Sequence, residues 1–236
     1  MYNNISHHQK KVLIVAAHPD DEVLGCGGAI AKHSDQGDIV NILIVAEGLT
    51  SRSPSRNRLN VSHELTHLEE AAQKSSLILG AQAVQLLDLP DNRLDSLDRL
   101  DLVKIIEDHI FSFQPQIVYV HHCGDVNIDH RLLHEAVVTA CRPTPDNKVL
   151  RLLSYEVPSS TEWQTPESAP LFQPNYFINI EDQFTRKLQA LECYSSEMRN
   201  WPHPRSIRAV KHLSSWRGSQ VGFDVAEAFC LLRALK

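Results

Sequence analysis

The chain lacks long hydrophobic runs and has no surplus of positive charge. Its longest apolar stretches, such as Val12 to Ala17, have the length of a strand and are far too short to cross a membrane. Lys and Arg together number 23 against 29 Asp and Glu, and no segment gathers enough basic residues to follow a phosphate backbone. We therefore expect no integral membrane segment and no nucleic-acid partner.

Cysteine pairs and a signal peptide are also missing. The five cysteines are widely spaced, odd in number and without a C-x-x-C pair, which argues against a disulfide framework and against a thiolate zinc site. The start of the chain, Met1 to Lys11, is polar and has no apolar signal-peptide core behind it. These features predict a cytoplasmic protein with reduced thiols.

Short apolar runs alternate with amphipathic stretches along 236 residues, of which 42% are hydrophobic. This length predicts one domain, residues 1–236, with residues 1–10 as a poorly ordered tail. The predicted strands are Val12–Ala17, Ile39–Ala46, Ala83–Leu87, Ile117–Val120 and Leu150–Val157. The predicted helices are Val23–Gln36, Ser62–Leu79, Leu97–Phe113 and Arg131–Ala140. The alternation predicts a Rossmann-like α/β fold, with a mostly parallel sheet flanked by helices on both faces.

The order changes after Val157, where four prolines punctuate a long loop. Beyond it, Tyr176–Ile180 is typical of a strand and Glu181–Tyr194 of a helix, and the tail from Arg205 predicts two more helices. We expect this C-terminal elaboration to cover one face or edge of the sheet.

A dense polar turn, His18-Pro19-Asp20-Asp21, follows the first predicted strand. Ligand sites of open α/β sheets lie at the carboxyl ends of the strands, and three ionisable side chains packed there need compensation. A divalent cation would compensate, because imidazole nitrogen and carboxylate oxygen are both good zinc ligands. A simpler explanation is that Asp20 or Asp21 caps the next helix. Two aspartates plus His18 exceed what a cap requires, so we predict a metal site.

The glycines after this turn have a spacing that differs from that of a dinucleotide-binding motif. Gly25, Gly27 and Gly28 form G-x-G-G inside the predicted helix, whereas the motif places G-x-G-x-x-G at the helix start. We interpret them as positions of close packing between helix and sheet.

A second polar loop, His121 to His130, follows the fourth predicted strand and holds three histidines, two aspartates and one asparagine. His130 and His134 have the i, i+4 spacing of H-E-x-x-H enzymes, but the glutamate of that motif is missing. We therefore favour His130 as a metal ligand and place His134 on a helix face. His63 and His67 share this spacing without catalytic neighbours, which favours a solvated helix face.

Together these residues resemble the PIG-L/LmbE-like zinc deacetylases, which include de-N-acetylases of N-acetylglucosaminyl lipids and thiol-cofactor precursors. The strongest match is Ala17-His18-Pro19-Asp20-Asp21-Glu22, and Asn127-Ile128-Asp129-His130 stands where the family has H-x-D-H. The similarity covers nearly the whole chain and continues through Leu86, Asp88, Pro90, Asp91, Glu156, Lys187, Tyr194, Glu197, Arg217-Gly218 and Glu227-Ala228-Phe229.

The resemblance implies that His18, Asp21 and His130 bind Zn²⁺ and that Asp20 is the general base. Asp129 would lie near the metal and the substrate. The implied reaction is hydrolysis of the N-acetyl amide of an amino sugar or glycoconjugate by a metal-bound water. The expected partner is thus a small N-acetyl amino sugar or its nucleotide or lipid conjugate, and a homo-oligomer is compatible with the sequence.

One departure from the family pattern is Asn127, which replaces the first histidine of H-x-D-H. That histidine is thought to polarise the substrate carbonyl, and asparagine can donate a hydrogen bond there without carrying a proton. Either donation by Asn127 suffices, or His121 or His122 supplies the imidazole.

Candidate substrate-binding residues are Arg52, His122 and His203. Arg52 lies in a serine-rich loop after the second predicted strand, and a solvated loop remains the simpler explanation for the neighbouring Arg56 and Arg58. The segment Trp201 to Arg205 is a candidate rim and Trp163 a candidate sugar-stacking aromatic, although both also fit structural roles.

Two other functions fit parts of the sequence. A metal-dependent hydrolase of another bond, such as a phosphoester, could use the same site, but no further carboxylates for a second metal are evident. A sugar-binding or nucleotide-binding Rossmann-like protein without catalysis would not need the set of His18, Asp20, Asp21 and His130.

Overall fold

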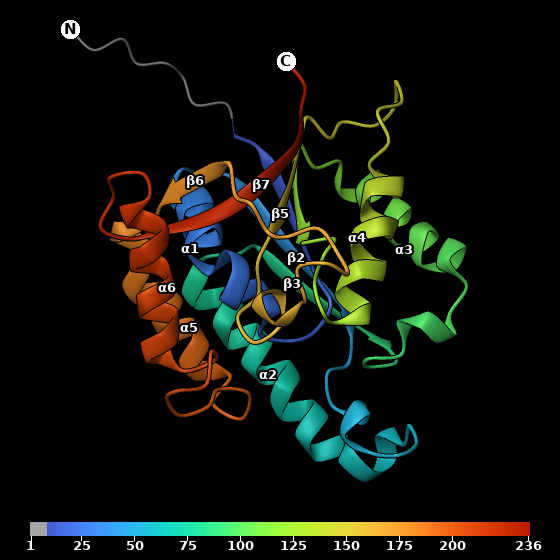
Figure 1. Ribbon diagram of the computed structural model, residues 1–236. Helices are drawn as coiled ribbons and strands as arrows, with labels where there is room; N and C mark the ends of the chain where they lie inside the picture. The colour runs from blue at the N-terminus through green and yellow to red at the C-terminus, as the bar shows by residue number, and fades with distance from the viewer. Residues whose placement is uncertain (1–8) are drawn as a thin grey trace, which may run out of the picture.

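The centre of the protein is a seven-stranded sheet with the order β3-β2-β1-β4-β5-β7-β6 (Figure 1). The computed structural model describes residues 9–236. The strands are β1 Lys11–Ala16, β2 Ile39–Ala46, β3 Ala83–Leu89, β4 Ile117–His121, β5 Arg151–Tyr155, β6 Tyr176–Asn179 and β7 Ala226–Ala234. Strands β1 to β5 pair in parallel, whereas β7 pairs antiparallel with β5 and β6. The predicted Rossmann-like, mostly parallel sheet is confirmed.

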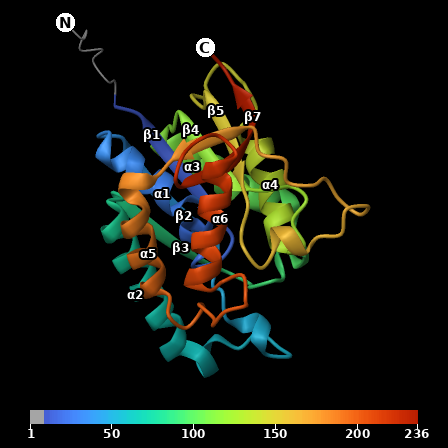
Figure 2. The same cartoon turned by 60° about the vertical axis from the view of Figure 1, so that its left-hand side comes forward.

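Helices cover both faces of the sheet, as Figures 1 and 2 show. Helices α3 and α4 lie together on one side, and α1, α2, α5 and α6 lie on the other. The helices are α1 Asp21–Asp35, α2 Ser62–Leu79, α3 Arg99–Phe113, α4 Ile128–Ala140, α5 Phe184–Cys193 and α6 Ile207–Ser219. Short 3₁₀ helices are η1 Thr50–Arg52, η2 Arg58–Val61, η3 Leu94–Ser96, η4 Thr161–Trp163 and η5 Glu181–Gln183.

Strand β1 is buried on both faces because it lies between two apolar cores. Its residues Val12 and Ile14 belong to the core under α1 and α5, and Leu13 and Val15 belong to the core under α3 and α4. Alternating side chains of a strand point to opposite faces, so a continuous apolar run fits this position. The arrangement places both polar loops that follow β1 and β4 at one end of the sheet.

The glycines in α1 lie where the helix packs closely against other elements. A Cβ atom at Gly28 would lie 2.6 Å from the Ile180 side chain, and one at Gly25 would overlap the Tyr155 ring of β5. The interpretation as close packing between helix and sheet is confirmed, and it fixes α1 firmly over the sheet.

The C-terminal tail differs from the prediction of two helices. Residues from Arg205 form one helix, α6, and one strand, β7, which lies inside the sheet between β5 and β6. The ends of the other helices and strands differ from the predicted ends by at most three residues. Helix α4, for example, begins at Ile128, earlier than predicted. Residues 1–8 of the predicted tail lie outside the described residues, and the carbonyl of Lys10 accepts a 2.8 Å hydrogen bond from Ile39 N.

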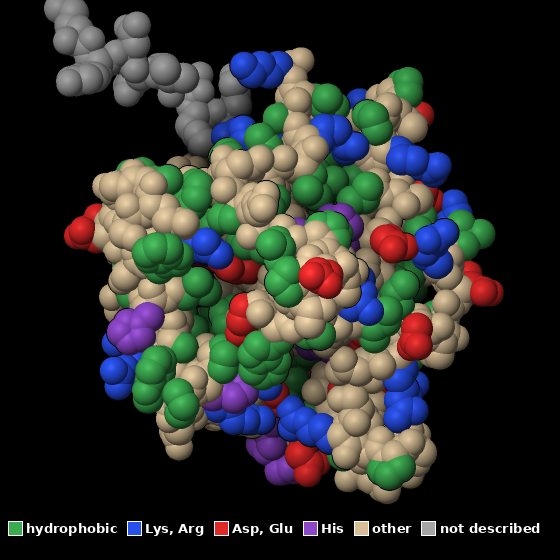
Figure 3. Space-filling model, viewed as in Figure 1, with side chains coloured by type: hydrophobic (Ala, Val, Ile, Leu, Met, Phe, Trp, Pro, Cys, Tyr) green, Lys and Arg blue, Asp and Glu red, His purple; other side chains and the backbone are tan. Residues whose placement is uncertain are grey.

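The surface on the face in Figure 3 intersperses acidic and basic side chains, and no single basic stripe crosses this face. Within residues 9–236, every helix is too short or too polar to span a membrane.

Candidate metal centre

The turn between β1 and α1 holds its first carboxylate, Asp20, in an unusual backbone conformation. Asp20 has φ 110° and ψ −29°, a left-handed conformation that non-glycine residues adopt at a cost of order 1–3 kcal/mol. Its side chain makes no capping hydrogen bond to α1, so the capping explanation does not account for it. The turn thus directs the Asp20 carboxylate away from the helix end.

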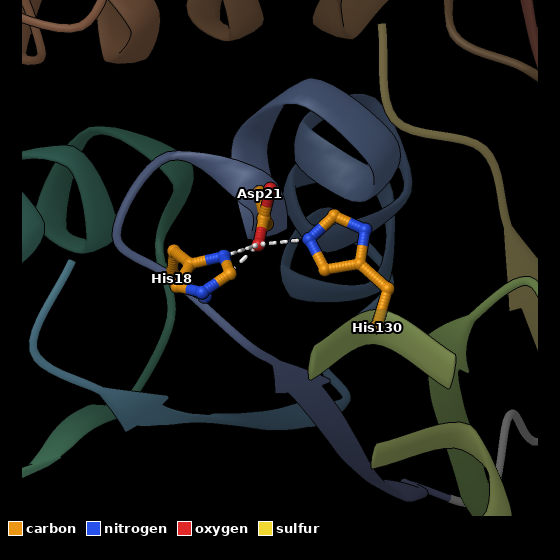
Figure 4. Close-up of side chains that lie close together, drawn as sticks. All are labelled: His18, Asp21 and His130. Carbon is orange, nitrogen blue, oxygen red and sulfur yellow. Dashed lines mark hydrogen bonds and ion pairs between the residues drawn. The ribbon is translucent and has the colours of Figure 1, made fainter. Parts of the chain in front are cut away.

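Two histidines, one from each polar loop, converge on one carboxylate oxygen of Asp21. Asp21 Oδ2 lies 3.3 Å from His18 Nδ1 and 3.2 Å from His130 Nε2 (Figure 4). The first two residues come from the β1–α1 turn and the third from the first turn of α4. The potential ligand atoms of all three lie within 4.8 Å of one another.

Two carboxylates contact the other ring nitrogen of His18, Nε2, and fix the orientation of the imidazole. His18 Nε2 lies 3.0 Å from Asp129 Oδ2 and 3.3 Å from Asp91 Oδ1. Asp129 also accepts backbone hydrogen bonds from Asn92 at 2.7 Å and Leu94 at 2.9 Å, so it is fully engaged. A carboxylate that accepts the Nε2 proton leaves Nδ1 free for a metal. Asp129 therefore lies beside the cluster, where it holds His18.

Asp125 holds His130 as Asp129 holds His18. No role for Asp125 was predicted from the sequence. His130 Nδ1 lies 3.2 Å from Asp125 Oδ2. Asp125 is itself held by the hydroxyl groups of Ser160 and Thr161, the latter at 2.6 Å. The two histidines thus present opposite nitrogens to Asp21 and bond a buried carboxylate with the other nitrogen.

The cluster stabilises positive charge. Burial alone would lower the pKa of His130, but Asp21 and Asp125 raise it to about 9. Burial would raise the pKa of Asp21, but His130 and His121 hold it well below its usual range. The same field that retains protons on the imidazoles would favour a divalent cation in their place.

The residues present fit a zinc ion. His130 Nε2 is buried and has no hydrogen-bond partner among the described residues, although it faces Asp21 Oδ2. Two imidazole nitrogens and one carboxylate oxygen form a donor set of catalytic zinc sites, with positions left for water and substrate. A bound cation would satisfy the unpartnered nitrogen.

A chain of charged groups leads from the cluster to the cavity rim. Arg205 Nη1 lies 3.3 Å from Asp20 Oδ2 and 3.7 Å from Glu197 Oε2. Glu197 is buried and accepts two hydrogen bonds from Arg52 Nη2, at 2.6 and 2.7 Å. Burial and the neighbouring Asp21 raise the pKa of Asp20 well above its usual range, and Arg205 opposes this rise.

A cavity of about 210 Å³ opens over the cluster. Its lining includes Arg52 and Asn127, as expected of substrate-binding and oxyanion-binding candidates, but excludes His122 and His203. His122 is buried with Nε2 2.9 Å from the Pro170 carbonyl oxygen, and His203 Nδ1 accepts the Arg205 N–H at 3.1 Å. These two histidines therefore hold loops.

Asn127 occupies the position of the missing family histidine and also caps a helix. Its side-chain oxygen accepts the Asp129 N–H at 2.8 Å, and its amide donates to Asn92 Oδ1 at 2.9 Å. His121 is fully buried under the cluster, where its Nε2 accepts the Ala17 N–H at 2.8 Å. Of the three candidates for the oxyanion role, Asn127 alone lines the cavity.

Arg205, from the candidate rim Trp201 to Arg205, lines the cavity, whereas five other histidines and arginines considered from the sequence lie outside it. His134 bonds the His121 carbonyl oxygen at 2.8 Å, and His63 and His67 are exposed on α2. Arg56 and Arg58 both bond Glu47, at 3.0 and 3.1 Å, which anchors the loop after β2. The loop is anchored in this way, and its residues 51–60 are all exposed, as the explanation of a solvated loop expects.

The fold and the site define an α/β enzyme class with a histidine–carboxylate cluster at the carboxyl ends of parallel strands. The family model described as PIG-L: GlcNAc-PI de-N-acetylase matches residues 13–141, more than half of the chain. The chain belongs to this family of deacetylases.

Individual relatives show the same likeness over most of the chain. The uncharacterized deacetylase YaiS of Escherichia coli is 29% identical, covering 81% of this chain and 94% of that protein. The diacetylchitobiose deacetylase of Thermococcus kodakarensis is 30% identical, covering 80% of this chain and 70% of that protein. The crystal structure of GalB, a 4-carboxy-2-hydroxymuconate hydratase of Pseudomonas putida, shares the fold with a TM-score of 0.74 at 22% identity, covering 95% and 96% of the two chains.

Proposed function

We propose that this protein is a zinc-dependent hydrolase that removes the N-acetyl group from an amino sugar or glycoconjugate. The observation that carries the proposal is the convergence of His18, Asp21 and His130 beneath a cavity whose wall also bears Asp20. Membership of the de-N-acetylase family supports it, as does the relative named for its action on diacetylchitobiose.

In this proposal the zinc ligands are His18 Nδ1, Asp21 Oδ2 and His130 Nε2. A zinc ion supplies Lewis acidity, which polarises a carbonyl and lowers the pKa of water to about 7. Asp129 and Asp125 hold the two imidazoles in the orientation that such binding needs.

Asp20 is the proton carrier of the reaction. Its carboxylate takes a proton from the water that attacks the acetyl carbonyl and passes it to the departing amine. Burial raises the pKa of Asp20 above its usual range, which makes its carboxylate a stronger base for this exchange. Arg205, 3.3 Å away, positions the carboxylate.

Asn127 stabilises the charge that develops on the acetyl oxygen. An amide carries two N–H groups, and the hydrogen bond to Asn92 uses one of them. The second N–H is available to the cavity that Asn127 lines. Loss of a single oxyanion donor costs about 100-fold to 1,000-fold in turnover in other hydrolases.

The cavity dimensions favour one sugar unit inside and the rest of a conjugate outside. About 210 Å³ is below the roughly 300 Å³ at which pockets for drug-sized ligands begin. Ser51, Arg52 and Ser159 line it and offer hydrogen bonds to hydroxyl groups. We assign the enzyme to a reducing cytoplasm, because all five cysteines are unpaired.

An acetate-release screen of the zinc-loaded protein tests this function. The substrates are N-acetylhexosamines in free, nucleotide-linked and lipid-linked form, with an unsaturated dicarboxylate as a probe of hydratase activity. We expect acetate from at least one sugar and no hydration. Hydration without acetate release would replace this proposal by a hydratase like GalB.

Two substitutions test the roles of the adjacent aspartates. Asp20→Asn should retain zinc and lose about 100-fold to 10,000-fold in turnover, the range of general acid–base catalysis. Asp21→Ala should lose zinc, measured by metal analysis after dialysis. Asp101→Asn on the exposed surface of α3 is the matched control. Equal zinc loss in Asp20→Asn and Asp21→Ala would contradict the division of roles.

A further inference from the structure

A second cavity, of about 310 Å³, lies at the opposite end of the sheet from the metal cluster. Its walls come from the C-terminal half of α1, from β6 and from the beginning of β5 (compare Figure 1). His33 near the end of α1 lines this cavity, whereas Asp21 at the start of α1 lines the first. At 1.5 Å per residue, the two sites are about 18 Å apart along one helix.

Three cations line the second cavity, and the described residues that line it include no carboxylate. They are Lys10, Lys32 and Arg151. Lys32 Nζ donates to the Asn179 carbonyl oxygen at 2.5 Å, and Arg151 Nη1 donates to the Tyr176 hydroxyl at 3.1 Å. These partners are neutral and cancel no charge. A cluster of this kind stands out in a chain whose formal net charge is −6.

His33 lies in the wall of this cavity, beside the carboxylate of Asp38. It is buried, with Nδ1 2.7 Å from Asp38 Oδ2 and Nε2 3.0 Å from the Tyr119 hydroxyl. Burial lowers the pKa of His33, and Lys10 and Arg151 lower it further, which together outweighs the opposing effect of Asp38. Asp38 also accepts the Lys10 backbone N–H at 2.9 Å, and it is not among the residues that line the cavity, where three cations lie.

Four of the other lining residues are tyrosine or phenylalanine. Tyr119 is fully buried in the wall, and Tyr176, Phe177 and Phe223 complete an apolar surface beside the cations. The Arg151 guanidinium lies 5.6 Å from the centre of the Tyr176 ring, which holds both groups in place. Concave sites with apolar walls and a few convergent charged groups are typical binding sites for small molecules.

We propose that this cavity binds a small aromatic anion, with its phosphate or carboxylate group on Lys32 and Arg151 and its ring against Tyr176. The site is separate from the metal centre and does not depend on the activity proposed for that centre. Charge-assisted hydrogen bonds from the two cations bind the anionic group, and the aromatic wall packs against the ring of the ligand.

Isothermal titration calorimetry of the full chain with phenyl phosphate tests the proposal. We expect binding by the wild type and about tenfold weaker binding by Arg151→Met and by Lys32→Met, because each removes a charge-assisted contact. The matched control Lys104→Met, an exposed lysine on α3, should bind like the wild type. Phenol and inorganic phosphate should each bind at least about tenfold more weakly than phenyl phosphate.

The Arg52→Met variant separates this site from the metal cavity, which also contains arginine. Unchanged binding by Arg52→Met supports the proposal, and loss of binding in that variant would overturn it. Wild-type affinity in both Arg151→Met and Lys32→Met would also overturn it, as would equal affinity for phenol. Circular dichroism checks folding, and Lys32→Met carries the test if Arg151→Met does not fold.

Discussion

The region that the family model covers and the C-terminal region contribute different kinds of groups to the metal centre. Residues 13–141 hold His18, Asp21 and His130 together with the carboxylates that orient the histidines. Residues 142–236 supply Glu197 and Arg205 at the cavity rim and the hydroxyl groups that hold Asp125. The comparison indicates that the first region carries the chemistry and the second holds the first in place.

A buried ion pair of the C-terminal region bonds to α1 and so links the two regions. Lys187 Nζ lies 2.6 Å from Glu227 Oε1 and donates to the Leu24 carbonyl oxygen at 2.9 Å. Glu227 accepts the backbone N–H groups of Gly28 and Ala29 at 2.8 and 2.7 Å. The C-terminal region thus bonds directly to the backbone of the helix that begins with Asp21.

The largest expected effect comes from breaking this ion pair. Lys187→Met should lower the free energy of unfolding by about 3–5 kcal/mol, because it leaves Glu227 as a buried charge without its partner. Urea denaturation measures the loss, with the exposed Lys211→Met on α6 as control. Protein that is still folded should bind zinc in the wild-type ratio. A folded Lys187→Met protein that does not bind zinc would show that the C-terminal region is also needed for metal binding, which contradicts the comparison.

A smaller effect is expected from Asp125→Asn, within the catalytic region. The amide cannot accept the His130 proton as a carboxylate does, so zinc affinity should fall about 10-fold to 100-fold, as for other carboxylates that support metal-bound histidines. Competition with a chromogenic chelator measures the affinity. Asp146→Asn in an exposed loop is the control. Unchanged affinity would show that Asp125 serves the fold alone, which would weaken the comparison.

The most gradual effect concerns Glu22, where the two regions share a hydrogen bond. The Tyr194 hydroxyl donates to Glu22 Oε1 at 2.6 Å, and burial raises the pKa of Glu22 to about 7 in spite of this bond. The folded protein therefore binds the Glu22 proton more tightly than the unfolded chain does. Its contribution to stability is complete below the unfolded pKa of 4.5 and is lost as the pH rises to about 7.

In metal-free protein this loss amounts to about 1.4 kcal/mol for each pH unit within that window. Glu22→Gln cannot ionise, so its unfolding free energy should fall less steeply between pH 5 and about 7. Denaturation at several pH values compares the two slopes. Parallel slopes in the wild type and Glu22→Gln would contradict the raised pKa.

Local sequence patterns predicted the sheet and the position of the cluster. The continuous apolar run of β1 requires burial on both faces, and His18 and Asp21 follow directly at its carboxyl end. His130 follows a neighbouring parallel strand, so topology alone brings its loop near the first. The sequence pattern was sufficient here because an apolar strand and the polar residues that follow its end are recognised within a few neighbouring residues.

Long-range contacts explain what the sequence did not predict. Strand β7 contains Ala226, Glu227, Leu231 and Leu232, which favour helices locally, but pairing with β5 and β6 outweighs that preference. The link between Arg205 and Asp20 spans 185 residues and has no local signature. The contact between His122 and Pro170, which lies in the long loop far along the chain, has no local signature either.

The position of β7 has a consequence for the order in which the chain assembles. Strand β6 reaches the sheet only through β7, which follows about fifty residues later, so β6 has no strand to pair with while the ribosome is still producing residues 180–225. Until then β5 is an open edge, with the exposed N–H and C=O groups that invite pairing between nascent chains. A chain that ends before residue 226 would therefore contain the three proposed metal ligands and would expose the unpaired backbone groups of β5 to other chains.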